Sequence, residues 1–382
     1  MEHLIIVIAC DCYDSTNTGG VITAQRFTRI LREQGHTVRI IAPGKPEKDK
    51  YLVPEFGRNN PLGKLCEQQG ITLAKINRDS IREALTGADV LYTLIPTPMA
   101  YACIKIAKEM GVPVTTGFHT LPENCTYNVY LGWFKALNSF GYTLLKWLFY
   151  SKVNFIHCPT QFVCDQLEKH HYKANKYVFS NGTIPFFHPM EVERPEELKN
   201  KFVIISVGRL SNEKRQDILI KAVNRCKYKD DIAIILGGKG PNEKKYRNLA
   251  KKLPNPIHIE FYDQENLRKT LNMCDLYVHC ADAEVESMSC TEAFSCGIVP
   301  LISDAKMSAT KQFALTKNNI FKAGSSKDLA KHIEYWMDNR EELSNLSKQY
   351  IDLSKSYSIY KCADKMVSMF HDAIEEKKNK VM

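Results

Sequence analysis

Two glutamates with a fixed spacing are the first candidates for chemistry in this chain. Glu284 and Glu292 are separated by seven residues in a polar stretch. An apolar run before them, Leu276 to His279, is typical of a buried strand end, and Thr291 to Ser295 is typical of a helix start. Backbone N–H groups at a helix start lack intrahelical partners and lie at the positive end of the helix dipole, so the loop could hold a phosphate or a sugar hydroxyl.

A structural interpretation of the same residues is open as well. Ser289 and Glu292 have the spacing of a capping box, in which Glu292 would only close its own helix. On the pattern alone this interpretation is favoured, because capping boxes are far commoner than paired catalytic carboxylates.

Two cations form a second candidate site. Arg209 and Lys214 follow the apolar run Phe202 to Val207 and flank the start of a helical segment, Arg215 to Cys226. Two positive charges added to a helix dipole favour a diphosphate, although they could equally be solvated surface charge. Gly237 to Pro241, after the next apolar run, predicts a flexible turn at the same sheet edge.

The first half of the chain offers two glycines and a histidine. Gly19 and Gly20 lie between the apolar run Leu4 to Ala9 and a helical segment, where glycines allow a ligand close to the backbone. They lack the spaced fingerprint of dinucleotide enzymes, and a plain strand-to-helix turn is an equal alternative. His119 follows the strand-like Val112 to Thr116, and open α/β sheets bind ligands at the carboxyl ends of strands, although a lone histidine is usually structural.

One aromatic segment, Tyr130 to Tyr150, needs its own explanation. It contains Trp133 and Trp147 and is interrupted by Lys135 and Lys146, too often for a membrane span. It could lie in a lipid interface or receive an acyl chain. A core helix of the first domain is the favoured alternative from the residues alone.

The elements that must position these residues alternate as strand and helix along 382 residues, which exceeds one hydrophobic core and predicts two domains. The best linker is the charged, proline-containing stretch Pro189 to Asn200. The net charge of +9 favours an anionic partner. Cys10 and Cys12 have no second pair at zinc spacing, so we expect no metal site.

The chain starts Met1-Glu2-His3 and enters Leu4 to Ala9 without a charged leader or cleavage site, so we expect a cytosolic protein. Only the net charge favours nucleic-acid binding, because the lysines are dispersed along the sequence and form no basic stripe.

Taken together, the motifs resemble a family: the retaining glycosyltransferases of the GT-B fold that share a Glu, seven residues, Glu motif, commonly called family 4. The matching features are the Gly19-Gly20 loop, His119, Ser180-Asn181-Gly182, Val207 to Leu210 with Glu213-Lys214, Gly238 to Pro241, and Glu284 with Glu292 ahead of Gly297 to Pro300.

Within that family three phrases, residues 117–124, 283–290 and 308–315, resemble bacterial glycolipid synthases, which place a hexose on diacylglycerol from a UDP-sugar. The usual family loop has a glycine after the first glutamate, whereas Val285 and Glu286 follow here. This departure goes in the direction of the lipid branch and leaves the sugar contacts of the loop open.

The resemblance implies an α/β fold of the GT-B type, with two Rossmann-like domains whose parallel sheets face each other across a cleft. Residues 1–190 would form an acceptor and membrane-side domain, with 358–382 as a last helix packing back on it. Residues 191–357 would bind the nucleotide-sugar.

The resemblance also implies roles for individual residues. Arg209 and Lys214 would hold the diphosphate, Glu292 the ribose hydroxyls and Glu284 the donor sugar, while His119 closes on the donor from the other domain. The catalytic candidates are thus His119, Glu284, Arg209 and Lys214, and the donor site would add Gly19, Gly20, Gly240, Val285, Glu286, Ser287, Met288, Ser289 and Glu292. Preplaced cations would stabilise the departing UDP, so no metal and no cofactor are expected.

The activity that follows is transfer of glucose or galactose from a UDP-sugar to a lipid hydroxyl, such as that of diacylglycerol or ceramide, giving an α-glycolipid. Such an enzyme would bind anionic lipids peripherally at the inner face of the cell membrane. A lipid acceptor favours membrane contact over a core helix for the aromatic segment, through Trp133, Phe134, Trp147 and Phe149. The alternatives are a transferase for a surface polysaccharide or polyprenyl-linked sugar, and a non-catalytic sugar-nucleotide or membrane-binding protein.

Overall fold

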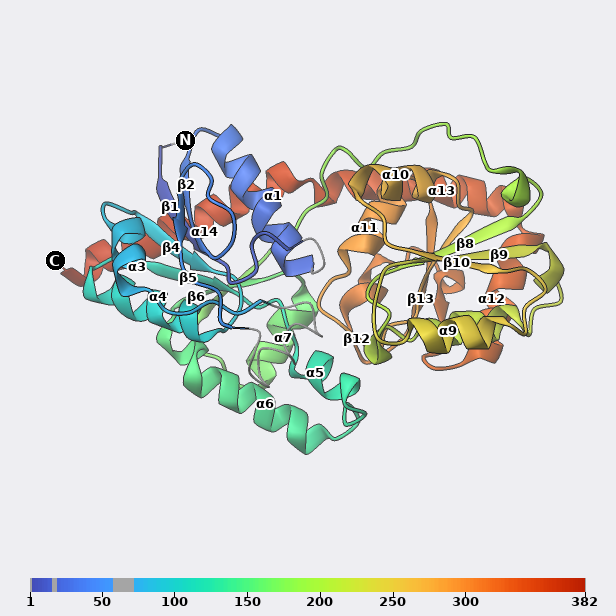
Figure 1. Cartoon of the computed structure of the whole chain (residues 1–382), viewed down its shortest axis with the longest axis horizontal. Helices are drawn as coiled ribbons and strands as arrows, with labels where there is room; N and C mark the ends of the chain where they lie inside the picture. Colours follow the sequence, from blue (N-terminus) through green and yellow to red (C-terminus); the bar gives the residue numbers. More distant parts are fainter. Residues whose placement is uncertain (1, 16–18, 58–71, 382) are drawn as a thin grey trace. The chain divides into compact units, whose positions relative to one another are not determined.

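A computed structural model describes residues 2–15, 19–57 and 72–381 and divides the chain into two compact units. Unit 1 comprises Met1–Thr120, Lys135–Gly182 and Ile359–Met382, and unit 2 comprises Leu121–Phe134 and Thr183–Ser358. Figure 1 shows that each unit is built around its own sheet.

The sheet of unit 1 has seven parallel strands in the order β3-β2-β1-β4-β5-β6-β7. Their bounds are β1 Ile5–Ala9, β2 Thr37–Ala42, β3 Lys50–Leu52, β4 Val90–Thr93, β5 Val114–Gly117, β6 Phe155–Cys158 and β7 Asn175–Val178. The central strands are buried and apolar, as expected for parallel strands covered on both faces.

The helices of unit 1 include the last one of the chain. Their bounds are α1 Gly19–Glu33, α3 Arg78–Leu85, α4 Pro98–Glu109, α6 Lys135–Leu148, α7 Gln161–Lys169 and α14 Ile359–Val381. The helix α14 packs on α1 and on β4, β5 and β6, and Gln34 of the first part of the chain donates a hydrogen bond to Asp364. Segments more than 300 residues apart in sequence therefore share one core.

Unit 2 contains a six-stranded parallel sheet in the order β10-β9-β8-β11-β13-β15 and a small pair, β12-β14. The strands are β8 Phe202–Val207, β9 Ile232–Gly237, β10 Ile257–Glu260, β11 Leu276–His279, β12 Ala283–Glu284, β13 Val299–Ser303, β14 Met307–Ser308 and β15 Ile320–Phe321. The helices are α5 Pro122–Asn128, α8 Gln216–Val223, α9 Glu243–Ala250, α10 Gln264–Asn272, α11 Met288–Ser295, α12 Ser326–Asp338 and α13 Arg340–Ser354.

Each sheet reverses its strand order at one place. The reversal lies between β1 and β4 in unit 1 and between β8 and β11 in unit 2. Open parallel sheets bind ligands beyond the carboxyl ends of the strands at such a reversal. The predicted α/β class with two parallel sheets is confirmed, and the topology indicates where in each unit a ligand site should form.

Candidate active site

The reversal in unit 2 brings together residues that the sequence places about seventy positions apart. Arg209 follows β8, Lys214 ends the short 3-10 helix Asn212–Lys214, and Glu284 ends β12 just beyond β11. The Lys214 ammonium donates a hydrogen bond to Oε2 of Glu284. Both side chains are largely buried, at 22% and 11% exposed, so this ion pair is only weakly screened by solvent.

The Glu284 carboxylate is held ionised by its neighbours. Burial alone raises its pKa, but the charge of Lys214, together with hydrogen bonds from Lys214 and the backbone of Val285, brings the pKa below its ordinary value. The imidazole of His279 has its Nε2 3.7 Å from the same carboxylate oxygen. Burial lowers the pKa of His279 to about 4, so this ring is neutral at pH 7.

The other cations of this loop also have carboxylate partners. Arg209 contacts Glu213 at 3.1 Å. Arg215 donates to Asp282 at 2.8 Å and to Asp217 at 3.2 Å. Burial lowers the pKa of Arg215, but these two carboxylates raise it above its ordinary value. Unit 2 thus presents a compact array of paired charges at the carboxyl edge of its sheet.

The loop before α11 adopts an unusual backbone conformation. Ser287 is the N-cap of α11 and lies in the left-handed region, at φ 76°, with no side-chain capping bond. The capping box expected from Ser289 and Glu292 is therefore not formed. The hydroxyl of Ser289 instead donates to the carbonyl of Val207 at 3.1 Å and contacts the Tyr277 hydroxyl at 2.9 Å, which ties α11 to the ends of β8 and β11. Non-glycine residues with positive φ cluster at functional sites.

The remaining predicted donor residues of unit 2 fall into two groups. Glu286 and Glu292 are buried, at 1% and 6% exposed, whereas Val285, Met288 and Ser289 are partly exposed. A Cβ on Gly240 would lie 2.4 Å from the carbonyl oxygen of Leu210, so close backbone packing already accounts for a glycine at this position.

The segment Leu121–Phe134 supports this site from outside the sheet. Asn124 donates to the carbonyl of Ala283 at 3.3 Å, next to Glu284. The side chain of Asn212 donates to the carbonyl of Asn128 at 3.2 Å, next to Lys214. Both contacts lie within unit 2 and fix the loops that carry the ion pair.

The predicted residues of unit 1 lie together near its own reversal. Gly19 and Gly20 are the first residues of α1, and a Cβ on Gly20 would lie 3.9 Å from the Cβ of His119. Residues 16–18 of the predicted loop are outside the described part of the chain. Burial lowers the pKa of His119 to about 4. Its Nε2 lies 3.0 Å from the hydroxyl of Tyr92, which also contacts Nδ1 of His157 at 3.2 Å.

The sequence pattern does not single out Tyr92, His157 and His279 as functional residues. All three lie within buried strands, at β4, β6 and the end of β11, where they look like ordinary core positions. For His279 the position at a strand end was the available signal, as it was for His119.

The predicted membrane residues divide sharply. Trp133, Phe134 and Trp147 are exposed, at 70%, 44% and 70%. Phe149 is only 3% exposed and packs edge-on against Tyr150, with ring centroids 5.0 Å apart. The prediction for Phe149 is wrong, because α6 ends at Leu148 and the following turn directs this ring into the core.

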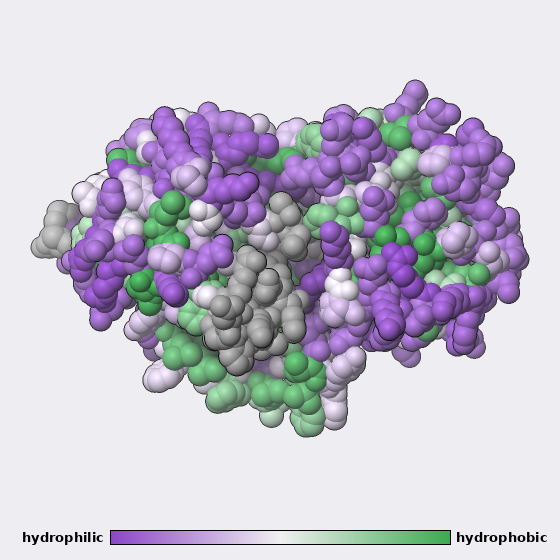
Figure 2. All heavy atoms as spheres, viewed as in Figure 1, coloured by the Kyte–Doolittle hydropathy of each residue, from purple (hydrophilic) through white to green (hydrophobic). Residues whose placement is uncertain are grey.

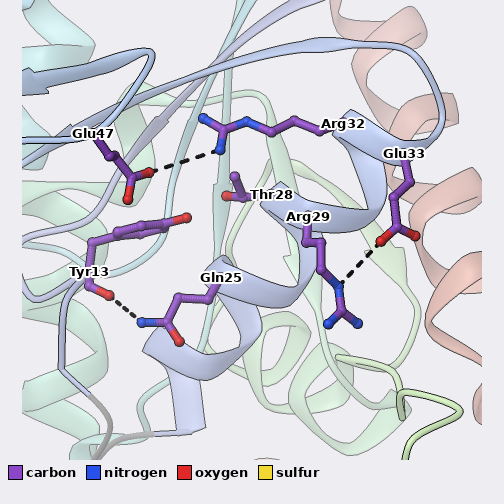
Figure 3. A pocket seen from close by; sticks show the side chains of 7 residues that line it. All are labelled: Tyr13, Gln25, Thr28, Arg29, Arg32, Glu33 and Glu47. Carbon is purple, nitrogen blue, oxygen red and sulfur yellow. Dashed lines mark hydrogen bonds and ion pairs between the residues drawn. The ribbon is translucent and has the colours of Figure 1, made fainter.

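A separate hollow on unit 1 does not coincide with the predicted residues. It is lined by residues of α1 and of two loops: Tyr13, Gln25, Thr28, Arg29, Arg32, Glu33 and Glu47 (Figure 3). Its charged side chains pair with one another, Arg29 with Glu33 at 3.5 Å and Arg32 with Glu47 at 3.9 Å. We therefore assign it no ligand.

Two further observations concern metals and membranes. Across residues 2–15, 19–57 and 72–381, no group of three or more His, Cys, Asp or Glu side chains is placed to hold a metal ion. The helices in the described part of the chain are all too short or too polar to cross a bilayer.

Comparison with known families gives two matches that together cover most of the chain. Residues 190–352 match the model for glycosyl transferases group 1, and residues 18–184 match the model for glycosyltransferase family 4. The chain is a family 4 glycosyltransferase. Members of this family use a nucleotide-sugar donor and retain the configuration of the sugar, so the family predicted from the motifs is confirmed.

Individual relatives that match most of this glycosyltransferase are distant in sequence. Alpha-monoglucosyldiacylglycerol synthase of Streptococcus pneumoniae is 23% identical over 313 residues, which cover 74% of this chain and 67% of that protein. The crystal structure of Anabaena HepE in complex with UDP and glucose has a TM-score of 0.72 at 15% identity, and the match covers 96% of this chain and 98% of that chain. This likeness establishes the GT-B fold.

A shorter match has higher identity. The crystal structure of the catalytic domain of cholesterol-alpha-glucosyltransferase from Helicobacter pylori is 44% identical, with a TM-score of 0.38. The match covers 41% of this chain and 99% of that chain.

Proposed function

We propose that this glycosyltransferase moves glucose or galactose from a UDP-sugar to the hydroxyl of a membrane lipid and forms an α-glycolipid. The observation that carries the lipid acceptor is the exposed face of α6. Leu137, Phe140, Leu144, Trp147 and Leu148 recur at helical spacing, and each is at least 39% exposed. Figure 2 shows hydrophobic side chains gathered over α6.

This helix contributes little to the core of unit 1, where Tyr142 is its one buried aromatic side chain. Only Asn138 and Tyr142 of α6 are buried, so the core-helix interpretation of the segment does not hold. A helix with a continuous exposed apolar face is typical of a surface that contacts a membrane or a partner.

Lys146 of this segment and Lys152, just after it, donate hydrogen bonds to backbone carbonyls of unit 1. Lys146 donates to the carbonyl of His170 at 2.9 Å, and Lys152 donates to the carbonyl of Trp147 at 3.0 Å. The hydroxyl of Tyr172 donates to the carbonyl of Tyr142 at 2.7 Å. These bonds fasten α6 to unit 1 and leave its apolar face outward, where we expect it to dock on lipid.

Two relatives support the choice of substrates. The Streptococcus pneumoniae relative is a synthase of a glucosyl diacylglycerol by its name, and HepE is crystallised with UDP and glucose. The net charge of +9 favours an anionic lipid surface. We therefore place the enzyme peripherally on the cytoplasmic face of the cell membrane.

The ion-paired array of unit 2 supplies the donor chemistry in this proposal. Arg209 and Lys214 bind the diphosphate, and Glu284, next to Lys214, accepts hydrogen bonds from hydroxyls of the sugar. The bond between the sugar C1 and the phosphate oxygen breaks, and the acceptor hydroxyl oxygen bonds to C1 from the same face. Its proton passes to the departing phosphate, and UDP leaves. Cations fixed beside the phosphate stabilise this developing charge more than they stabilise the bound donor.

Mass spectrometry of lipid extracts tests this function. Purified protein is incubated with UDP-glucose or UDP-galactose and vesicles that contain diacylglycerol, ceramide or cholesterol, three lipids with a free hydroxyl. We expect a monohexosyl lipid from one donor. Intact UDP binding without any hexosyl lipid would contradict the lipid acceptor and favour a polysaccharide or polyprenyl-linked acceptor.

A further inference from the structure

Three side chains of unit 1 form a hydrogen-bonded chain that ends at His119. Tyr92 lies on β4 and His157 on β6, on either side of β5, and His119 follows the end of β5. We propose that His157 and Tyr92 are positioning residues that hold His119 with its proton on Nε2, so that Nδ1 accepts a hydrogen bond from a hydroxyl of the donor sugar. The assignment of this hydroxyl to the donor sugar rests on the proposed function.

The proton positions follow from His157, which is the end of this hydrogen-bonded chain farthest from His119. Nε2 of His157 lies 2.7 Å from the carbonyl oxygen of Phe179, which can only accept, so Nε2 carries a proton. Nδ1 of a neutral His157 then has a lone pair and accepts from the hydroxyl of Tyr92. Tyr92 has one proton to give, so its oxygen must accept from Nε2–H of His119.

Reversing this direction would require a second proton on His157. That ring is fully buried and stacks on Phe179 with centroids 3.9 Å apart. Burial, and then the neighbouring His119, lower the pKa of His157 well below its ordinary value. Burial also raises the pKa of the Tyr92 phenol. At neutral pH each member of the chain is therefore uncharged, and one proton arrangement satisfies every contact.

The backbone of β5 leaves space for this chain. A Cβ on Gly117 would lie 2.2 Å from Nε2 of His119 and 2.5 Å from the Tyr92 hydroxyl. The hydroxyl of Tyr150 donates to the carbonyl of Gly117 at 3.2 Å and fixes this strand end. The hydrogen bond between His119 and Tyr92 therefore depends on a glycine at position 117.

Nδ1, the other nitrogen of the His119 ring, determines which kind of ligand atom this ring can contact. Nδ1 of His119 is buried, and the residues that the structure describes offer it no hydrogen-bond partner. With the proton on Nε2, this atom can only accept. It suits a hydroxyl, which donates, and it repels a phosphate oxygen, which cannot. The first turn of α1 lies near this residue, since a Cβ on Gly20 would lie 3.9 Å from the Cβ of His119.

The tautomer is measured on the free protein by long-range proton–nitrogen NMR with ¹⁵N-labelled histidine, with assignment by His119→Gln. The wild type should show His119 protonated on Nε2 only. Tyr92→Phe should give a mixture of both tautomers of His119. The control Tyr172→Phe removes a buried hydroxyl that is not part of this hydrogen-bonded chain, and it should leave the His119 signals unchanged. A wild-type ring protonated on Nδ1, or an unchanged tautomer in Tyr92→Phe, would overturn the proposal.

A kinetic comparison tests the link to the sugar. UDP-glucose or UDP-galactose is compared with singly deoxygenated analogues of the same donor. One analogue should lose roughly five-fold in kcat/KM with the wild type, about the contribution of one neutral hydrogen bond, and Tyr92→Phe should abolish this preference. A preference retained in Tyr92→Phe would refute the role of Tyr92. A protein with the Nε2 tautomer but no transfer to any lipid would contradict the proposed function and leave the proton arrangement intact.

Discussion

The two sheets reverse their strand order at equivalent places and carry opposite chemistry there. Unit 2 places paired charges beyond its strands, with Lys214 against Glu284 and Arg209 against Glu213. Unit 1 has a neutral chain of Tyr92, His119 and His157, on β4, after β5 and on β6, to one side of its reversal. The shared topology determines where a ligand site forms, whereas the side chains determine what it binds. Charges suit the diphosphate, whose charge changes in the reaction, and neutral acceptors suit hydroxyls.

The largest effect is expected in the charged site. Lys214→Ala removes a cation from the proposed diphosphate site and leaves the buried Glu284 without its partner, so turnover should fall by about ten-fold or more. Steady-state kinetics measure this effect, and circular dichroism checks the fold. Lys227→Ala is a matched control, because Lys227 forms an exposed pair with Asp338 at 3.0 Å. Full activity in Lys214→Ala would remove this residue from the donor site.

An intermediate effect is expected in the neutral site. Gly117→Ala forces a methyl group into the contact between His119 and Tyr92, which should lower the free energy of unfolding by about 1–3 kcal/mol. Denaturant titration measures the change. Gly20→Ala is the control for stability, because its Cβ would make only ordinary contacts at 3.7 and 3.9 Å. Equal stability of the two variants would show that the neutral chain is not tightly packed.

The smallest effect concerns pH. Neighbouring charges depress the pKa of Glu284 in the folded protein below the ordinary 4.5. Its charged form therefore stabilises the fold at neutral pH, and this contribution is lost as the pH falls through the folded value. Glu284→Gln lacks that titration. Wild type should be the more stable at about pH 6, and the difference in melting temperature should shrink towards about pH 3. A difference that stays constant would contradict the charged pair.

The sequence alone predicts the features that rest on a repeated pattern or on several motifs together. Alternating strands and helices predicted the α/β class. The family resemblance grouped Arg209, Lys214 and Glu284, and in the structure Lys214 lies against Glu284. The sequence alone does not identify single buried residues as functional. Tyr92 and His157 occupy strand positions that any large core residue could fill, and only the strand order shows that both meet His119 across β5.

Helix ends and helix faces account for the errors. The capping-box spacing predicts Ser289 as the N-cap, but α11 begins at Met288 with Ser287 as its N-cap. The aromatic pattern groups Phe149 with Trp147, but α6 ends between them, at Leu148. An apolar stripe also looks the same whether protein or lipid covers it, and for α6 only the structure shows that unit 1 leaves it exposed.

The central claim is that the charged site of unit 2 handles the donor while α6 brings the enzyme to its lipid. The most direct test measures hexosyl transfer to long-chain diacylglycerol in vesicles and to a short-chain, water-soluble diacylglycerol. We expect Phe140→Ser with Trp147→Ser to lose activity on vesicles and keep it on the soluble acceptor, and Lys214→Ala to lose both. A double serine variant that is as active as the wild type on vesicles would contradict this division of roles.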